Sequence, residues 1–120
     1  MNGDSLLTYL EQMQAVASDT SRFVEGMTED LFSSDLVMQR AVGMNLVMIG
    51  EATMRIMDQY PDFVTDHPDI PWNAMRGMRN RLAHGYFTVD LSTVWQTVHI
   101  AIPKLRVQLE SLRRWRAEGE

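Results

Sequence analysis

Residues 36–57 read LVMQRAVGMNLVMIGEATMRIM, and this segment sets the architecture of the chain. Apolar side chains surround more than one face of the helix that the segment predicts. Ser34 or Asp35 can cap the start of this helix, and Pro61 stops it after Tyr60. A helix that is apolar on most sides is buried on most sides. In so small a domain, we therefore expect it to meet a second subunit as well.

The residues before this segment predict another long helix. From about Asp4 to Gly26, apolar residues recur at spacings of three and four, with a polar gap only near Thr20. Asp4 or Ser5 can cap the start, and Gly26 can help to end it. Residues 28–33 are then expected to form a short connector to the apolar helix.

After the apolar helix, the chain is expected to form a loop and then a shorter helix. Residues 61–71 are rich in Pro and Asp, which indicates the loop. The helix begins near Pro71 or Trp72, because proline suits a first helical turn, and it runs to about Ala83. Gly85 is a natural C′ residue after its end.

A last helix opens at Asp90 or Ser92 and runs to about Arg116. A regular apolar stripe at three–four spacing predicts its buried face, and Pro103 inside the stripe should kink it. No strand, repeat or low-complexity tract is recognisable. The chain therefore predicts one all-α domain over residues 1–120, an antiparallel bundle of four main helices that is dimeric.

Composition excludes several classes of protein. Cysteine is absent, so there is no disulfide framework, thiolate metal site or cysteine nucleophile. The chain begins without a recognisable signal peptide, and no apolar run approaches the roughly 18 residues of a membrane span. We therefore expect a cytoplasmic protein with no membrane partner. Because the net charge is −5, any contact with nucleic acid must be local.

One segment could carry chemistry. Residues 79–86 read RNRLAHGY and lie where the short helix is expected to end. Arg79 and His84 are five residues apart, about 140° around a helix, so they do not share a face. Asn80 and His84 are four apart and do share one. Asn80 can therefore hydrogen-bond and orient the histidine, and Gly85 allows an exit that turns Tyr86 back toward the same site.

The residue types in this segment suit metal-free cleavage of RNA by its own 2′-hydroxyl. A base removes the 2′ proton, a cation stabilises the phosphorane, and an acid protonates the leaving 5′ oxygen. His84 suits proton transfer near neutral pH, and Arg79 would supply positive charge where negative charge develops. Arg76 and Arg81 add local positive potential and are candidate RNA-binding residues. No His, Asp and Glu cluster has metal-ligand spacing, so we expect neither a metal nor a cofactor.

Structural interpretations of the same residues stay open. An arginine and a histidine near the C-terminus of a helix are electrostatically favourable there in any protein. Glu51 and Arg55 are four residues apart and could form an intrahelical ion pair. Glu51 also lies among apolar residues, so it could instead face the site or a partner.

The segment also resembles a known signature. Arg79, His84 and Tyr86 fit the R-x4-H-x-Y signature of the HepT-like branch of the HEPN superfamily. Further stretches resemble that family in the same order along the chain. They are Ile49-Gly50-Glu51-Ala52, Ile70-Pro71-Trp72, Gly77-Met78-Arg79-Asn80, Val89-Asp90, Val94-Trp95 and Ile102-Pro103-Lys104-Leu105.

This resemblance implies a dimer in which the two Arg–His segments lie close together at the subunit interface. It implies a toxin of a toxin–antitoxin pair that acts as a metal-independent RNA endonuclease. Arg79 and His84 would be the catalytic pair, supported by Asn80. The antitoxin would be an MntA-like nucleotidyltransferase that transfers AMP to Tyr86. Anionic phosphates beside the cleft would then block RNA and offset the arginine charge.

Two other functions remain compatible with the sequence. The first is an inactive HEPN module that binds a nucleotide or a nucleotidyltransferase partner. The second is a structural helical dimer in which Arg79 and His84 only stabilise the end of a helix.

Overall fold

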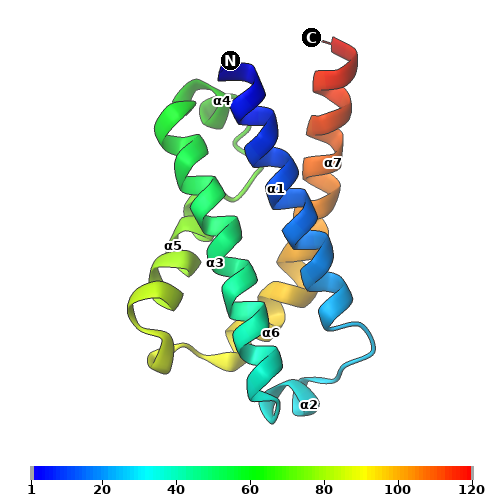
Figure 1. The fold of residues 1–120 in the computed structure, drawn as a ribbon, viewed down its shortest axis with the longest axis vertical. Helices are drawn as coiled ribbons and strands as arrows, with labels where there is room; N and C mark the ends of the chain where they lie inside the picture. Colours follow the sequence, from blue (N-terminus) through cyan, green and yellow to red (C-terminus); the bar gives the residue numbers. More distant parts are fainter. Residues whose placement is uncertain (1, 120) are drawn as a thin grey trace.

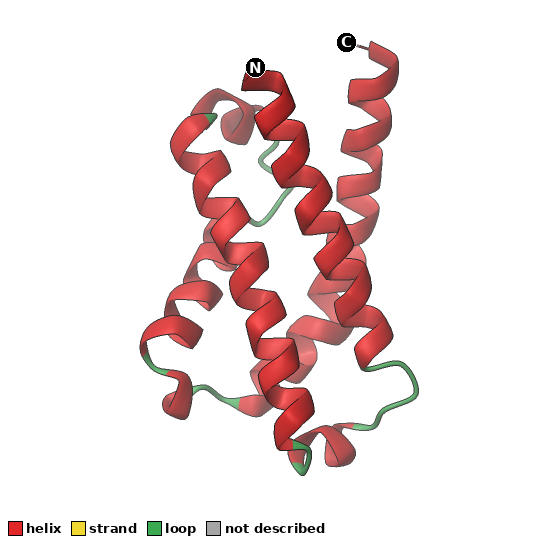
Figure 2. Ribbon diagram, viewed as in Figure 1, coloured by secondary structure: helices red, strands yellow, loops and turns green. Residues whose placement is uncertain are grey.

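The structure is a computed structural model that describes residues 2–119, with the side chains of residues 5–114. Over this range the chain forms helices joined by loops, and no strand is present (Figure 2). The all-α prediction is therefore confirmed. No helix in the described part of the chain is long and apolar enough to cross a membrane.

The helices follow one another closely along the chain. In order they are α1 (Asn2–Phe23), α2 (Glu29–Ser33), α3 (Leu36–Gln59), α4 (Pro61–Asp66), α5 (Trp72–His84), the 3-10 turn η1 (Tyr86–Thr88), α6 (Leu91–Gln96), the π-helical segment η2 (Thr97–Ala101) and α7 (Ile102–Gly119). Figure 1 shows α1 and α3 side by side and antiparallel, with α7 beside α1 and α5 on the other side of α3. The predicted antiparallel bundle is confirmed.

The apolar helix α3 is the centre of this bundle. The carboxylate of Asp35 caps it by accepting a hydrogen bond from the Met38 N–H at 2.9 Å, and the helix ends before Pro61. It packs against α1 on one side and α5 on another (Figure 1). Most of its apolar surface is therefore covered within one subunit, but Val37 and Met44 remain 80% and 59% exposed.

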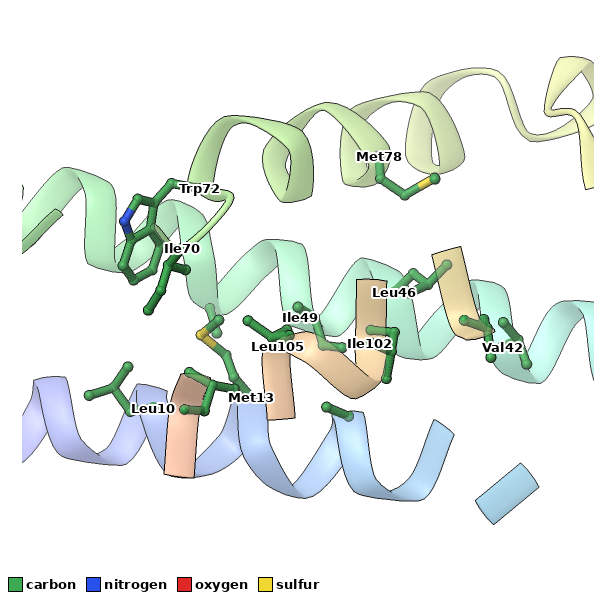
Figure 3. Close-up of a cluster of buried hydrophobic side chains, with 14 of the residues drawn as sticks. Leu10, Met13, Val42, Leu46, Ile49, Ile70, Trp72, Met78, Ile102 and Leu105 are labelled. Atoms are coloured by element: carbon green, nitrogen blue, oxygen red, sulfur yellow. The ribbon is translucent and has the colours of Figure 1, made fainter. Parts of the chain in front are cut away.

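The core lies where α1, α3, α5 and α7 meet. Figure 3 shows buried side chains from these helices pointing toward one another. They include Leu10 and Met13 of α1, Val42, Leu46 and Ile49 of α3, Trp72 and Met78 of α5, and Ile102 and Leu105 of α7. Burying one such large apolar side chain contributes about 1.5–3 kcal/mol. Packing of these faces therefore holds the short helix α5 in place.

The polar gap near Thr20 is part of this core. Thr20 is fully buried, and its hydroxyl donates to the Val16 carbonyl at 2.7 Å. The same hydroxyl accepts a hydrogen bond from Nδ2 of Asn45 at 3.0 Å. The buried side chains of Thr20 and Asn45 therefore link α1 to α3.

Two segments that were expected to be irregular form short helices. In α2 the hydroxyl of Thr28 accepts a hydrogen bond from the Leu31 N–H at 3.2 Å, which caps the helix. In α4 Pro61 occupies the first turn. With five and six residues, these helices are too short for a repeating apolar pattern to reveal them.

The ends of α1 also differ from the prediction. The helix begins at Asn2, so Asp4 and Ser5 lie inside it and the predicted cap at these residues is wrong. It ends at Phe23, and Gly26 follows with a φ of 76°, a left-handed conformation that glycine adopts readily. Gly26 therefore lies in the turn that follows the helix, and the predicted end of the helix near Gly26 is late by about one turn.

The end of α5 differs in its geometry. Gly85 caps the helix, and its N–H donates to the Arg81 carbonyl at 2.9 Å, but its φ is −152°. Gly85 therefore does not adopt the left-handed conformation expected of a C′ glycine, and that prediction is wrong. The Thr88 hydroxyl and N–H both donate to the Gly85 carbonyl, at 2.8 and 2.9 Å, so the chain continues directly into η1.

The last helix is interrupted where the sequence indicates. Asp90 caps α6 by accepting hydrogen bonds from the Ser92 N–H and the Thr93 hydroxyl. The helix then widens into η2 and returns to α-helical geometry at Ile102, immediately before Pro103. Proline lacks the N–H that would bond to the preceding turn, and a π-helical turn accommodates that loss. The irregularity predicted at Pro103 therefore takes the form of a π-helical segment just before the proline.

Candidate active site

The site begins with a close contact between α3 and α5 at Gly50. A Cβ atom on Gly50 would lie 2.2 Å from the Cβ of Arg79 and 3.1 Å from the carbonyl oxygen of Met75. Only a residue without a side chain allows the two helices to approach this closely. The aliphatic part of Arg79 therefore lies directly on the backbone of α3.

The next residue of α3 binds the guanidinium of Arg79. The Nε atom of Arg79 donates to Oε1 of Glu51 at 2.6 Å, and its Nη1 donates to Oδ1 of Asn80 at 2.9 Å. The side chains of Arg79 and Glu51 are 21% and 43% exposed. Among the described side chains, no hydrogen bond engages Nη2. The guanidinium is therefore held on one side while its Nη2 group can receive a ligand.

This contact decides between the two interpretations of Glu51. An intrahelical ion pair between Glu51 and Arg55 is not found in the described part of the chain. Glu51 instead faces Arg79 of α5, as the second interpretation expects. Arg55 is exposed and lines, with Glu51 and Arg76, a hollow of about 570 Å³.

His84 is the last residue of α5, and it is exposed. Its imidazole makes no hydrogen bond with the side chains or backbone that the structure describes. It borders an open groove of about 610 Å³ whose other lining residues are Met78, Asn80, Arg81, Gly85, Thr88, Val89, Asp90 and Thr93. The histidine is therefore accessible to a ligand that enters this groove.

Asn80 lies between the arginine and the histidine on the exposed side of α5. The predicted hydrogen bond from Asn80 to His84 is not present; the amide oxygen of Asn80 accepts from Arg79 instead. Asn80 nevertheless lines the groove that His84 borders. It therefore connects the two halves of the site, although through Arg79 and not through the imidazole.

Tyr86 lies in a neighbouring cavity and does not line the His84 groove. Its ring is half-buried over α3, where a Cβ on Gly43 would meet its Cε1 atom at 3.4 Å. This cavity has a volume of about 200 Å³ and is also lined by Arg40 and Phe87. Phe87 is 95% exposed and contacts the Tyr86 ring edge-on, with the ring centroids 5.9 Å apart.

The two additional arginines of the segment lie in different places. Arg81 lines the groove beside His84. Arg76 is exposed on the other side of α5, where its Nη2 donates to Oδ1 of Asn73 at 3.1 Å. The structure therefore brings Arg81 to the histidine and Arg76 to the hollow beside Glu51.

Three polar residues of the groove, Thr88, Asp90 and Thr93, were not among the predicted site residues. Asp90 and Thr93 come from the start of α6, and Thr88 comes from η1. The sequence marks Asp90 as a helix cap and as part of the Val89-Asp90 stretch that resembles the family, and its carboxylate does serve as a cap. No group of three or more His, Asp or Glu side chains in the described part of the chain could hold a metal ion.

The fold and the site together define a class of protein: an all-α bundle with an accessible Arg–Asn and His set at the end of one short helix. The family model described as Ribonuclease HepT-like matches residues 8–112. The chain therefore belongs to the HepT-like ribonuclease family, and the resemblance noted in the sequence is confirmed.

Individual relatives agree with this assignment. The chain is 38% identical over 106 residues to a probable ribonuclease HepT of Thermococcus cleftensis, which covers 88% of this chain and 94% of the relative. It is 31% identical over 104 residues to a candidate RNase of Caldanaerobacter subterraneus subsp. tengcongensis, covering 87% of this chain and 90% of that protein. No solved structure gives a significant match to the chain.

Proposed function

We propose that this protein is a metal-independent RNA endonuclease in which Arg79 and His84 carry the reaction. The observation that supports this most directly is the hydrogen bonding of Arg79. Its guanidinium is anchored by Glu51 and Asn80, while Nη2 is free of other hydrogen bonds in the described structure. A fixed cation with a free donor group is suited to a phosphate oxygen. Membership of the HepT-like ribonuclease family supports the same reaction.

The proposed reaction uses the 2′-hydroxyl of the RNA as the nucleophile. A base takes the 2′ proton, the 2′ oxygen bonds to phosphorus, and the bond from phosphorus to the 5′ oxygen breaks. An acid protonates the 5′ oxygen, which gives a 2′,3′-cyclic phosphate and a free 5′-hydroxyl. His84 can serve as the base or the acid, and Arg79 stabilises the charge on the phosphorane.

A dimer would supply the second proton-transfer group. Within one subunit, Arg79 and His84 lie on different sides of Asn80. Val37, Met44 and Met48 are exposed on α3, and at spacings of seven and four residues they share one face of that helix. We propose that a second copy covers this face, so that two His84 side chains enter one composite cleft.

The proposed control of this nuclease is covalent. In this proposal the protein is the toxin of a toxin–antitoxin pair. An MntA-like nucleotidyltransferase antitoxin transfers AMP from ATP to the Tyr86 hydroxyl, and pyrophosphate is released. Tyr86 lies one residue beyond Gly85, which itself lines the His84 groove. The added phosphate would bring negative charge next to the cleft and weaken RNA binding. Arg40 lines the same cavity as Tyr86 and could pair with that phosphate.

The test is cleavage of total cellular RNA in EDTA by protein whose Tyr86 is unmodified by mass spectrometry. We expect fragments from the wild-type protein and none from His84→Ala or Arg79→Ala. His99→Ala is a matched control, because His99 is also an exposed helical histidine, but it lies in η2 and its ring packs on Trp95 of α6. It should cleave like wild type. Intact RNA with folded, dimeric, unmodified wild type would refute the proposal.

The groove beside His84 supports one alternative. Its volume of about 610 Å³ lies in the range of small-ligand pockets, and Arg81 supplies a cation there. An inactive module that binds a nucleotide would use the same residues without cleaving RNA. Calorimetric titration with ATP and AMP distinguishes the two: tight binding by a protein that leaves RNA intact would favour the binding module.

A further inference from the structure

We infer that Glu51 is a positioning residue for Arg79. It holds the guanidinium through Nε so that the Nη side faces the RNA phosphate. The inference rests on the proposed nuclease function, because it assigns a role in that reaction to a residue outside the Arg79–His84 segment.

The hydrogen bonds of Arg79 define which of its donors are available. A guanidinium carries five N–H donors. Glu51 takes the Nε donor at 2.6 Å and Asn80 takes one Nη1 donor at 2.9 Å. The remaining donors are one on Nη1 and two on Nη2, and a guanidinium can use its Nη donors to form two parallel hydrogen bonds to a phosphate. Glu51 therefore leaves open the donors that phosphate recognition requires.

The two residues of this contact lie inside helices that pack against each other. Glu51 lies inside the 24-residue helix α3, and Arg79 lies inside α5. The neighbouring Gly50 sets the distance between the two helices at this point, because any Cβ there would collide with Arg79. The carboxylate and the guanidinium therefore meet in a geometry that the packing of the bundle fixes, which is what orienting a catalytic group requires.

Stability alone does not account for this carboxylate. With Glu51 43% exposed, the ion pair lies in the range where such pairs contribute little to folding. A negative charge beside a phosphate-binding arginine also weakens the binding of RNA in the ground state. Glu51 therefore adds little stability and opposes substrate binding. Its presence is explained if it fixes the orientation of Arg79.

Two substitutions separate orientation from charge. Glu51→Ala removes the acceptor, so Arg79 loses its orientation, and we expect kcat to fall on the order of 10²-fold. Glu51→Gln keeps an acceptor oxygen for Nε and removes the charge, so most of kcat should remain while KM decreases. Asp58→Ala is the matched control, because Asp58 is exposed on α3 and lines the same hollow. It should change neither constant appreciably.

A double-mutant cycle tests whether Glu51 acts through Arg79. If it does, the Glu51→Ala/Arg79→Ala double variant is no slower than Arg79→Ala alone. Wild-type kinetics in Glu51→Ala, or additive losses in the double variant, would overturn the inference. A loss in Glu51→Ala that merely follows a loss of thermal stability, with Glu51→Gln equally impaired, would also overturn it.

A readout without cleavage separates this inference from the nuclease proposal. In 15N NMR spectra of the wild-type protein, we expect an Arg79 Nε–H signal that is protected from exchange with solvent. This signal should be lost in Glu51→Ala. On addition of a 2′-O-methyl RNA, which cannot be cleaved, that signal should persist while the Nη signals shift. If RNA instead abolishes the Nε–H protection, it displaces Glu51 and the inference is wrong. Protected Nε–H and shifted Nη signals without any cleavage of ordinary RNA would refute the nuclease and keep the positioning role.

Discussion

The backbone of α3 at Gly50 lies directly against the side chain of Arg79 on α5. A Cβ atom at Gly50 would stand 2.2 Å from the Cβ of Arg79 and 2.8 Å from its Cγ. The next residue of α3, Glu51, binds the other end of the same side chain. Two consecutive residues of α3 therefore determine where the aliphatic part and the charged group of Arg79 lie.

This relationship predicts the effect of adding one methyl group. Gly50→Ala forces α5 away from α3, because the new atom meets both the Arg79 side chain and the Met75 backbone. We expect the free energy of unfolding to fall by about 1–3 kcal/mol, as in other overpacked sites. RNA cleavage should fall as well, since Arg79 is displaced. Chemical denaturation and a cleavage assay on the same preparation measure the two effects.

Gly77 provides the matched control for that substitution. It also lies in α5, but a Cβ there would meet nothing within 4 Å. Gly77→Ala should therefore raise the free energy of unfolding by about 0.5–1 kcal/mol through helix propensity alone. If Gly50→Ala behaves like Gly77→Ala, the close contact does not exist as described.

A second prediction concerns the shape of the cation at Arg79. Arg79→Lys keeps the positive charge but has one ammonium group, which cannot bond to Glu51, Asn80 and a phosphate in the same geometry. We expect kcat to fall about 10²–10³-fold, as when a transition-state donor is removed. Single-turnover cleavage of an RNA oligonucleotide measures it. Near-wild-type cleavage by the lysine variant would mean that charge alone suffices.

Much of the fold is predictable because its determinants are local. Asp35 caps α3 and Pro61 follows its end, and both signals are visible in the sequence. The short helices α2 and α4 are not visible in the apolar pattern, because each spans less than two turns. The start of α1 is also mispredicted, since Asp4 and Ser5 are common capping residues that here lie within the helix.

The site is predictable only in part, because its contacts are not local. Arg79 and His84 stand out through their residue types and spacing. The sequence alone does not identify the partner of Glu51. Arg55 lies four residues away in the same helix, whereas Arg79 is separated from Glu51 by 28 residues. Whether Glu51 pairs with Arg55 or with Arg79 depends on how α5 packs on α3 at Gly50. Spacing along one helix carries no information about that packing.

A third prediction concerns the buried pair that links α1 to α3. Thr20→Val keeps the size of the side chain but removes the oxygen that accepts from Asn45. The amide of Asn45 is then buried without this partner, and we expect the free energy of unfolding to fall by about 1–3 kcal/mol. Thermal or chemical unfolding measures the loss. Ser111→Ala, on the exposed side of α7, should be nearly neutral in comparison.

A fourth prediction concerns Arg81 in the groove beside His84. Arg81→Ala removes a cation from the proposed RNA path without touching Arg79, so KM should rise while kcat changes little. The dependence of RNA affinity on salt should weaken by about 0.7 in the log–log slope for one lost phosphate contact. Titrations at several salt concentrations measure this slope. Arg113→Ala in α7, where the arginine pairs with Glu110, is the control and should leave the slope unchanged.

The last prediction concerns the proposed modification of Tyr86. Tyr86→Phe removes the hydroxyl that would receive AMP but keeps the ring that packs on α3 at Gly43. We expect the variant to cleave RNA like the unmodified protein and to remain active when an MntA-like nucleotidyltransferase and ATP are present. Tyr9→Phe, on α1, is the control and should be silenced like wild type. If Tyr86→Phe is silenced too, the nucleotidyltransferase acts on another residue or by binding alone, and intact-mass spectrometry of the two variants distinguishes these outcomes.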